Sequence, residues 1–150
     1  MEIKITKIFS FNAAHHLTKY YGQCENIHGH TYKLKVTLCG EVQENGLVID
    51  FVIFKRIVQK HILNYLDHKN LNDIIDNPTS ENIAIWIYEK LKNFESLLKE
   101  EIKDPNLDED IKKYLASTSN EIDKSQSDNK IKIVKIKLYE SPTSYVTLIP

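Results

Sequence analysis

Apolar residues follow two different spacings along this chain, and the switch between them limits the folds that it can adopt. Apolar and polar side chains alternate over residues 3–11, and more regularly over residues 32–39. A spacing of two places successive side chains on opposite faces of a strand, so both segments are predicted to be half-buried β-strands. Lysines take the outward positions of the second strand, which suits an antiparallel sheet with one face in water. A turn at residues 44–46 and a short strand at residues 47–49 are expected next.

After that point the apolar residues recur every three or four positions. Asp50 is predicted to cap a helix that ends near Leu66. Thr79 or Ser80 is predicted to cap a second helix, whose apolar stripe continues to Leu98. Two amphipathic helices in succession can cover one face of a sheet.

Alternation returns near the C-terminus, over residues 131–138 and 145–149. It slips by one position at Ile133 and Val134, which predicts a β-bulge. Strands and helices are therefore segregated along the chain. We expect an α+β fold with a four-stranded antiparallel sheet and two helices on one face. Such a sheet leaves its edges open, and oligomerisation would close them.

The segment 100–130 follows neither spacing and is rich in Asp, Glu, Lys, Asn and Ser. A short helix around residues 111–115 is expected there, followed by a flexible surface loop over residues 117–130. We interpret the segment as an insertion in a single domain that spans residues 1–150.

Charge and composition exclude several classes of protein. Twenty Lys and Arg residues against 21 Asp and Glu residues give a formal net charge of -1, and Arg56 is the only arginine. This balance does not favour nucleic-acid binding. No apolar run reaches the ~20 residues that cross a bilayer, and the first residues lack the pattern of a secretory signal. Cys24 and Cys39 are too few for a disulfide framework. We expect a cytoplasmic protein that binds neither nucleic acid nor membrane.

Four of the six histidines lie between His15 and His30. His28 and His30 are two positions apart at the start of a predicted strand, so both imidazoles project from one face. If the first two strands pair as a hairpin, His15 reaches the same place, whereas His16 points the opposite way. Three neutral imidazoles around a divalent cation leave a fourth position open, as in catalytic zinc sites. The alternative is that the His-x-His spacing is a chance feature of a surface loop.

Three further groups offer acid–base chemistry. Cys24 precedes His28 by four residues, and its thiol can act as a metal ligand, a nucleophile or a general base. Asp67 and His68 follow the first predicted helix, and a carboxylate beside an imidazole can form a proton relay. Glu140 ends the last long strand on its inward phase, where a buried carboxylate needs a donor. The plainer interpretations are a small buried thiol, an ordinary loop pair and a solvated glutamate at the end of a strand.

Several separated segments, taken in this order, resemble the 6-pyruvoyltetrahydropterin synthase / 6-carboxytetrahydropterin synthase family. They are Phe11-Asn12-Ala13-Ala14-His15, Cys24 to Tyr32 with its His-Gly-His, Gly46 to Phe51, Leu66 to Asn72, Pro78 to Asn82 and Tyr139-Glu140-Ser141. Together they span most of the chain outside residues 100–130.

The resemblance implies the tunnelling fold, in which subunits assemble into a barrel. It also implies a homohexamer of two trimers with active sites at subunit interfaces. The implied residue roles are zinc ligation by His15, His28 and His30, general base chemistry by Cys24, proton relay by Asp67 and His68, binding of the pterin N–H groups by Glu140, and lining of the pterin pocket by Thr79 and Ser80.

The resemblance further implies a zinc-dependent lyase. Its substrate would be 7,8-dihydroneopterin triphosphate, and its products 6-carboxy-5,6,7,8-tetrahydropterin, acetaldehyde and triphosphate, early in the synthesis of queuosine. The spacing Cys-x-x-x-His-Gly-His is similar to that of the carboxy-forming branch. In some relatives a glutamate in this stretch goes with formation of a 6-hydroxymethyl-dihydropterin for folate synthesis, so Glu25, beside Cys24, keeps that activity open as an alternative. A pyruvoyl-forming enzyme is a further alternative within the family. A non-catalytic zinc- or pterin-binding protein is the third hypothesis, although it predicts loss of the thiol or the relay pair.

Overall fold

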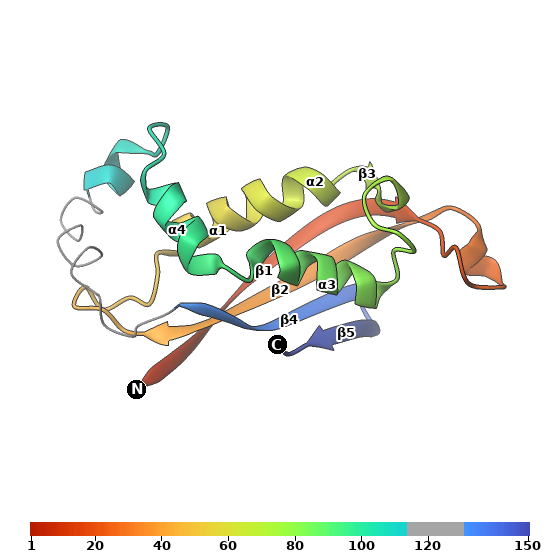
Figure 1. Cartoon of the computed structure of the whole chain (residues 1–150), viewed down its shortest axis with the longest axis horizontal. Helices are drawn as coiled ribbons and strands as arrows, with labels where there is room; N and C mark the ends of the chain where they lie inside the picture. The colour runs from red at the N-terminus through yellow and green to blue at the C-terminus, as the bar shows by residue number, and fades with distance from the viewer. Residues whose placement is uncertain (114–130) are drawn as a thin grey trace.

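The fold is built on one mostly antiparallel sheet (Figure 1). The computed structural model describes residues 1–113 and 131–150. The sheet has five strands in the order β3-β1-β2-β4-β5. Its four antiparallel strands are β1 (Glu2–His15), β2 (His28–Glu41), β4 (Lys132–Ser141) and β5 (Ser144–Leu148). These are the four strands that the alternation predicts, and β1 and β2 are longer than expected.

The fifth strand corrects the predicted count of four. β3 (Lys69–Asn70) contains only two residues, and it runs parallel to β1 opposite Ala13 and Ala14. A pairing this short carries no periodic signal in the sequence, so alternation could not reveal it.

The short strand expected at residues 47–49 is absent. The turn before it is confirmed, because the Gly46 amide donates a hydrogen bond to the Gln43 carbonyl. Val48 and Ile49 are buried, but the chain passes directly from the turn into the cap of the first helix. Their apolar character reflects burial in the core rather than strand pairing.

The predicted β-bulge is confirmed in β4. Thr37 of β2 lies opposite Lys135, whereas the next residue, Leu38, lies opposite Ile133. Val134 is therefore the extra residue. The bulge lets the alternation resume in phase, so that Ile136 and Leu138 face the core.

The first helical segment begins and ends where the sequence predicts. Asp50 caps α1 (Phe51–Val58) by accepting hydrogen bonds from the Val52 and Ile53 amides. A π-helical segment, η2 (Gln59–Leu63), continues it into α2 (Asn64–Leu66). A π turn contains more residues than an α turn and rotates the following side chains. Leu66 is consequently buried, whereas Tyr65, which the 3.6-residue pattern places in the core, is 52% exposed.

The second helix is interrupted where the sequence predicts continuity. Thr79 caps α3 (Ser80–Leu91) by accepting a hydrogen bond from the Asn82 amide. A break at residues 92–93 then separates α3 from α4 (Phe94–Ile102). Two short 3-10 turns, η1 (Gln23–Glu25) and η3 (Leu71–Asp73), complete the named elements.

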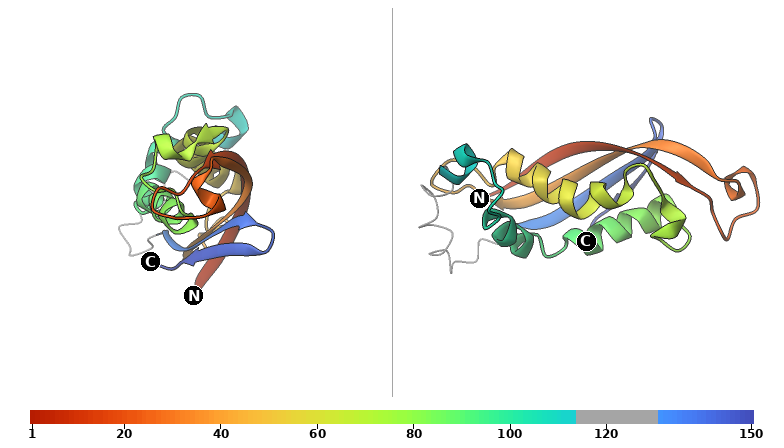
Figure 2. Two further views of the ribbon diagram at one scale, coloured as in Figure 1. Left: turned by 90° about the vertical axis from the view of Figure 1, so that its right-hand side faces the viewer. Right: turned by 90° about the horizontal axis from the view of Figure 1, so that it is seen from above.

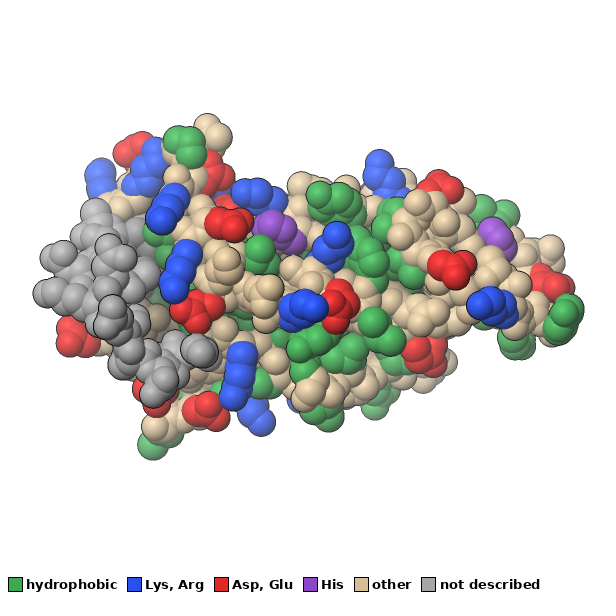
Figure 3. Space-filling view, in the orientation of Figure 1, with side chains coloured by type: hydrophobic (Ala, Val, Ile, Leu, Met, Phe, Trp, Pro, Cys, Tyr) green, Lys and Arg blue, Asp and Glu red, His purple; other side chains and the backbone are tan. Residues whose placement is uncertain are grey.

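The helices lie on one face of the sheet, as predicted (Figure 2). The core lies between the two layers, where Phe11, Tyr32, Leu34, Phe54 and Ile83 are fully or almost fully buried. Charges of both signs are interspersed on the face seen in Figure 3, in line with the near-zero net charge.

Part of the 100–130 prediction can be compared with the structure. Residues 109–113 are helical, which agrees with a short helix around position 111. Tyr114, Leu115 and the flexible loop expected over residues 117–130 lie outside the described residues. Among the described helices, none has the length and apolar character needed to cross a bilayer.

Candidate metal centre

The end of the β1–β2 hairpin brings the three predicted histidines together. In the antiparallel register, His15 lies directly opposite His28, and His30 lies opposite Ala13. Residues at a spacing of two share a face, so all three imidazoles project from the helix-covered side of the sheet. The predicted pairing of the first two strands as a hairpin is therefore confirmed, and it places His15 beside His28.

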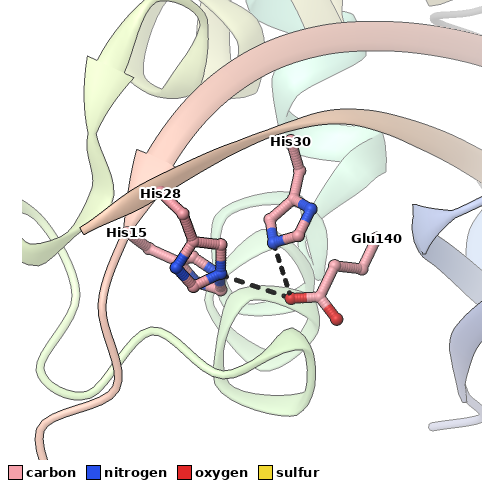
Figure 4. A group of neighbouring side chains, drawn as sticks. All are labelled: His15, His28, His30 and Glu140. Carbon is pink, nitrogen blue, oxygen red and sulfur yellow. Dashed lines mark hydrogen bonds and ion pairs between the residues drawn. The ribbon is translucent and has the colours of Figure 1, made fainter. Parts of the chain in front are cut away.

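The ligand atoms of four side chains converge at this point (Figure 4). The Nε2 atoms of His15 and His28 are 3.1 Å apart. Glu140 Oε1 lies 3.3 Å from His15 Nε2 and 3.2 Å from His30 Nε2. With one atom taken from each of His15, His28, His30 and Glu140, all four atoms lie within 4.8 Å of one another.

Backbone carbonyl groups fix which nitrogen of two imidazoles carries the proton. His15 Nδ1 lies 2.7 Å from the Pro78 carbonyl oxygen, and His28 Nδ1 lies 2.7 Å from the Asn26 carbonyl oxygen. A carbonyl oxygen only accepts hydrogen bonds, so in each neutral ring Nδ1 is the donor. The Nε2 lone pairs of both rings therefore point into the group, which is the usual arrangement of metal-binding histidines.

Such a convergence of acceptors is unfavourable without a cation. His30 Nε2 is buried and makes no hydrogen bond, despite its short distance to Glu140. Burial is the main cause of a lowered His30 pKa, opposed by the charge of Glu140 and reinforced by His15 and His28. Ligand atoms 2.0–2.1 Å from a tetrahedral zinc ion lie about 3.3 Å from each other, close to the separations found here. The donor set therefore fits a divalent cation.

Tyr32 is buried next to the histidines and contacts His15. Its ring stacks on Phe11 with centroids 4.9 Å apart, and its hydroxyl lies 3.4 Å from His15 Nδ1. Burial, followed by the charge of Glu140, raises the pKa of Tyr32, so the hydroxyl stays protonated. Sequence reasoning missed this residue as part of the site. The sequence signal that could have identified Tyr32 is its position two residues after His30, which places both side chains on the same face of β2.

The Glu140 carboxylate lies at the fourth position around the three imidazoles. The sequence predicts that this position is open. Tyr139 pairs with Tyr145 and Ser141 pairs with Ser144, so Glu140 is an extra residue at an irregularity between β4 and β5. Such bulges re-aim a side chain. Here the carboxylate continues the inward phase of Leu138 and reaches the imidazoles (Figure 4).

Cys24 lies near the end of β1 but does not join the four-residue group. It sits in η1, and its carbonyl oxygen accepts a hydrogen bond from the Leu17 amide at 2.8 Å. This bond ties the loop to the residues that follow His15. Cys24 is a half-buried free thiol, whereas Cys39 is buried in strand β2.

Asp67 and His68 form the expected pair at a different place. Asp67 Oδ1 lies 3.0 Å from His68 Nδ1 and accepts a hydrogen bond from the Asn12 amide at 2.9 Å. That hydrogen bond is the main cause of an Asp67 pKa below its ordinary value. His68 lines an open pocket of about 600 Å³, to which His30 also contributes. Within the described residues, no hydrogen bond or ion pair joins Asp67 or His68 to the metal-ligand group (His15, His28, His30 and Glu140).

Thr79 and Ser80 lie at the N-terminus of α3, directly after the residue that orients His15. The Thr79 side chain caps the helix, and the preceding Pro78 carbonyl accepts the hydrogen bond from His15. The cap of α3 and the metal-ligand group are therefore parts of one structure.

Fold and site together define a class of protein: an α+β chain with a histidine–carboxylate centre suited to a divalent cation at the end of a long hairpin. Residues 4–117 match the 6-pyruvoyl tetrahydropterin synthase family. The match covers more than half of the chain, so the chain belongs to this family.

Individual relatives agree with that assignment. The chain is 33% identical over 146 residues to 6-carboxy-5,6,7,8-tetrahydropterin synthase of Haemophilus influenzae, with 95% of each chain covered. It is 44% identical over 92 residues to dihydroneopterin monophosphate aldolase of Pyrococcus furiosus, covering 61% of this chain and 77% of that one. The structure of 6-pyruvoyl tetrahydropterin synthase from Caenorhabditis elegans covers 100% of this chain and 96% of its own, with a TM-score of 0.67 and 26% identity. The resemblance predicted from the motifs is confirmed, and the chain is an enzyme of the tetrahydropterin-synthase type, a lyase.

Proposed function

We propose that this enzyme is a zinc-dependent lyase that converts 7,8-dihydroneopterin triphosphate into 6-carboxy-5,6,7,8-tetrahydropterin, acetaldehyde and triphosphate. The observation that carries the proposal is the convergence of three imidazoles and a carboxylate, with the protons of the His15 and His28 rings directed away from the centre. Full-length similarity to a carboxytetrahydropterin synthase supports the choice of product. The product would enter the synthesis of queuosine.

His15, His28 and His30 would hold the zinc ion. Bound zinc would act as a Lewis acid toward the hydroxyl groups of the substrate side chain and acidify the adjacent C–H and O–H bonds. Cys24 is proposed as the general base, because η1 holds it beside the end of β1. Glu140 is proposed to bind the pterin N–H groups, and Thr79 and Ser80 to line the pterin pocket.

Asp67 and His68 are proposed to relay protons in a site shared between subunits. Among the described residues the pair is hydrogen-bonded to Asn12 and not to the metal-ligand group, and we propose that it acts in a neighbouring subunit's site. Homohexameric assembly as two trimers, with the sheets closed into a barrel, belongs to the same proposal. Residues 1–150 would form one pterin-synthase domain. A cytoplasmic location fits the two unpaired cysteines.

A second candidate function is removal of the side chain to give a 6-hydroxymethyl-dihydropterin for folate synthesis. The observation in its favour is Glu25, a second acid–base group directly after Cys24 in η1. Similarity to an aldolase that acts on dihydroneopterin monophosphate supports the same alternative. A 6-pyruvoyl product is a third outcome within the family.

One incubation separates these functions. The purified zinc-loaded protein is mixed with 7,8-dihydroneopterin triphosphate, and the pterin product is identified by mass spectrometry. We expect 6-carboxytetrahydropterin together with acetaldehyde. A hydroxymethyl or pyruvoyl product would replace the proposed function by the corresponding alternative, and absence of turnover would favour a binding protein.

Substitution of the thiol tests the assigned base. Cys24→Ala should lower the rate of carboxy-product formation by about 10²–10⁴-fold, the range typical for loss of a general base, while zinc content stays unchanged. Cys39→Ala is the matched control, because that thiol is buried away from the site and its loss should leave the rate nearly unchanged. An unaltered rate in Cys24→Ala would show that another group removes the proton.

A further inference from the structure

The four side chains of the metal-ligand group are not held equally firmly. His15 and His28 each donate a hydrogen bond to a backbone carbonyl, at 2.7 Å in both cases. These bonds fix the ring orientations whether or not a ligand is bound nearby. Permanent metal ligands are normally anchored in this way by a second set of partners.

Glu140 has no such anchor. Its Oε1 atom contacts only imidazole nitrogens, those of His15 and His30. In the part of the chain that the structure describes, its Oε2 atom makes no hydrogen bond or ion pair, and the side chain is 31% exposed. Among the described residues, only the imidazoles of His15 and His30 therefore hold the carboxylate in its present position.

The backbone at Glu140 also differs from that of the histidines. His15 and His28 lie in the regular register of a long hairpin. Glu140 lies at a bulge, one residue before the Ser141–Ser144 connection between β4 and β5. A residue outside the ladder can shift its side chain without breaking strand pairing.

We propose that Glu140 is an exchangeable fourth metal ligand, which closes the coordination shell of the substrate-free enzyme and leaves it when the substrate side chain binds. The inference rests on the proposed function for the identity of the displacing ligand, a pterin with a vicinal diol. Four ligands complete a tetrahedral zinc site, and a catalytic site needs a position for substrate. Departure of Glu140 supplies that position and also frees a carboxylate next to the bound pterin.

The exchange gives one carboxylate two mutually exclusive partners. Bound to the metal, it shields the ion from other anions and from adventitious ligands. Released, it accepts hydrogen bonds from the pterin N–H groups, which is its part in the proposed function. Substrate binding and loss of metal ligation by Glu140 are therefore the same event.

Cobalt substitution tests metal ligation without relying on turnover. The visible spectrum of Co²⁺ reports its ligand set, so the spectra of wild type, Glu140→Gln, Glu140→Asp and Glu44→Gln are compared. Glu140→Asp keeps the charge but shortens the side chain by one methylene, which separates ligation from a simple charge effect. Glu44→Gln, at an exposed turn, is the matched control. We expect both Glu140 variants to change the spectrum and Glu44→Gln to leave it unchanged.

Metal affinity supplies a second measurement. In competition with a chromophoric chelator, Glu140→Gln should bind Zn²⁺ at least about 10-fold more weakly than wild type, and Glu44→Gln should bind it equally well. A spectrum of Glu140→Asp identical to that of wild type, or a zinc affinity of Glu140→Gln within twofold of wild type, would overturn the proposal.

Neopterin, which carries the diol but no phosphate, tests the displacement. Binding of neopterin should change the Co²⁺ spectrum of wild type, and the spectra of wild type and Glu140→Gln should converge when both are saturated. Calorimetric binding without a spectral change in wild type would contradict displacement. No binding of neopterin at all, together with altered spectra of both Glu140 variants, would count against the pterin function while supporting Glu140 as a ligand.

Discussion

At the scale of single residues, the site depends on which nitrogen of each imidazole carries the proton. The carbonyl groups of Pro78 and Asn26 hold the protons of two imidazoles on Nδ1, so their Nε2 atoms face each other as acceptors. When the imidazoles are neutral and Glu140 is ionised, three of the four ligand atoms, the Nε2 atoms of His15 and His28 and the Glu140 carboxylate oxygen, can only accept hydrogen bonds. A divalent cation resolves this conflict, and that is the physical reason for assigning a metal centre.

The grouping of the three histidines could be predicted from sequence, whereas the groups that orient them could not. The spacing of His28 and His30 predicts that they share one face of a strand. Pairing of the two alternating segments then places His15 beside them. The carbonyl groups that orient the rings belong to loops, and their positions follow from tertiary packing rather than from residue type. Glu140 was predicted to face inward, but its contact with the imidazoles depends on a bulge that no pattern in the sequence indicates.

At the scale of elements, a small network of ion pairs joins α1 and η2 to α4 within the helical layer. Arg56 of α1 pairs with Glu101 of α4 and with Asp104, and Lys60 of η2 lies 3.5 Å from Glu101. Glu101 is only 2% exposed, so its charge needs these partners. The only arginine of the chain thus has a structural role.

The same layer contains a histidine whose environment makes stability depend on pH. Burial is the main cause of a lowered His61 pKa in η2; Lys60 and Lys90 lower it further, whereas Glu100 and Glu101 raise it. The unfolded chain, with an ordinary histidine pKa near 6.5, therefore binds more protons than the folded chain as the pH falls through 6.5. The free energy of unfolding is expected to decrease over that range.

Urea unfolding at pH 7.5 and pH 5.5 checks this expectation. The loss of stability between the two pH values should be smaller in His61→Gln than in wild type, and His16→Gln serves as a control outside the helical layer. An equal loss in wild type and His61→Gln would show that His61 does not contribute.

Element boundaries show where periodicity succeeds and where it fails. The caps at Asp50 and Thr79 are local interactions between a side chain and nearby amides, and the sequence predicts both. The π-helical segment η2 and the break after Leu91 are not local in this sense. Leu66, which follows the π-helical segment, and Phe94, which follows the break, are both buried.

At the scale of the whole molecule, the described chain has an exposed sheet face and unpaired strand edges. Beyond its two pairs with β3, the outer edge of β1 has no strand partner among the described residues, and the same is true of the outer edge of β5. The helix-free face carries lysines over tyrosine rings, with Lys33 Nζ 4.4 Å and Lys35 Nζ 5.3 Å from the centre of Tyr139. Pairing of edges between copies would place this face inside a closed assembly.

Mixing two inactive variants tests whether the active site is shared between subunits. His28→Ala lacks a proposed metal ligand and His68→Ala lacks the proposed relay imidazole, so each is expected to be inactive alone. If the relay pair serves a neighbour's metal centre, unfolding the two variants together and refolding them as mixed oligomers should restore a measurable part of the wild-type rate. Mixed oligomers with no more activity than the separate variants would place the whole site within one chain.

The central claim is that the three imidazoles bind one divalent cation, and elemental analysis tests it most directly. Purified wild type and His28→Ala are analysed by mass spectrometry for bound metals, and circular dichroism confirms that both are folded. Wild type is expected to contain about one zinc ion per chain, since the three histidines and Glu140 form a single group. His28→Ala should contain far less. Equal zinc content in the two proteins, or a wild type that takes up no divalent metal, would contradict the account.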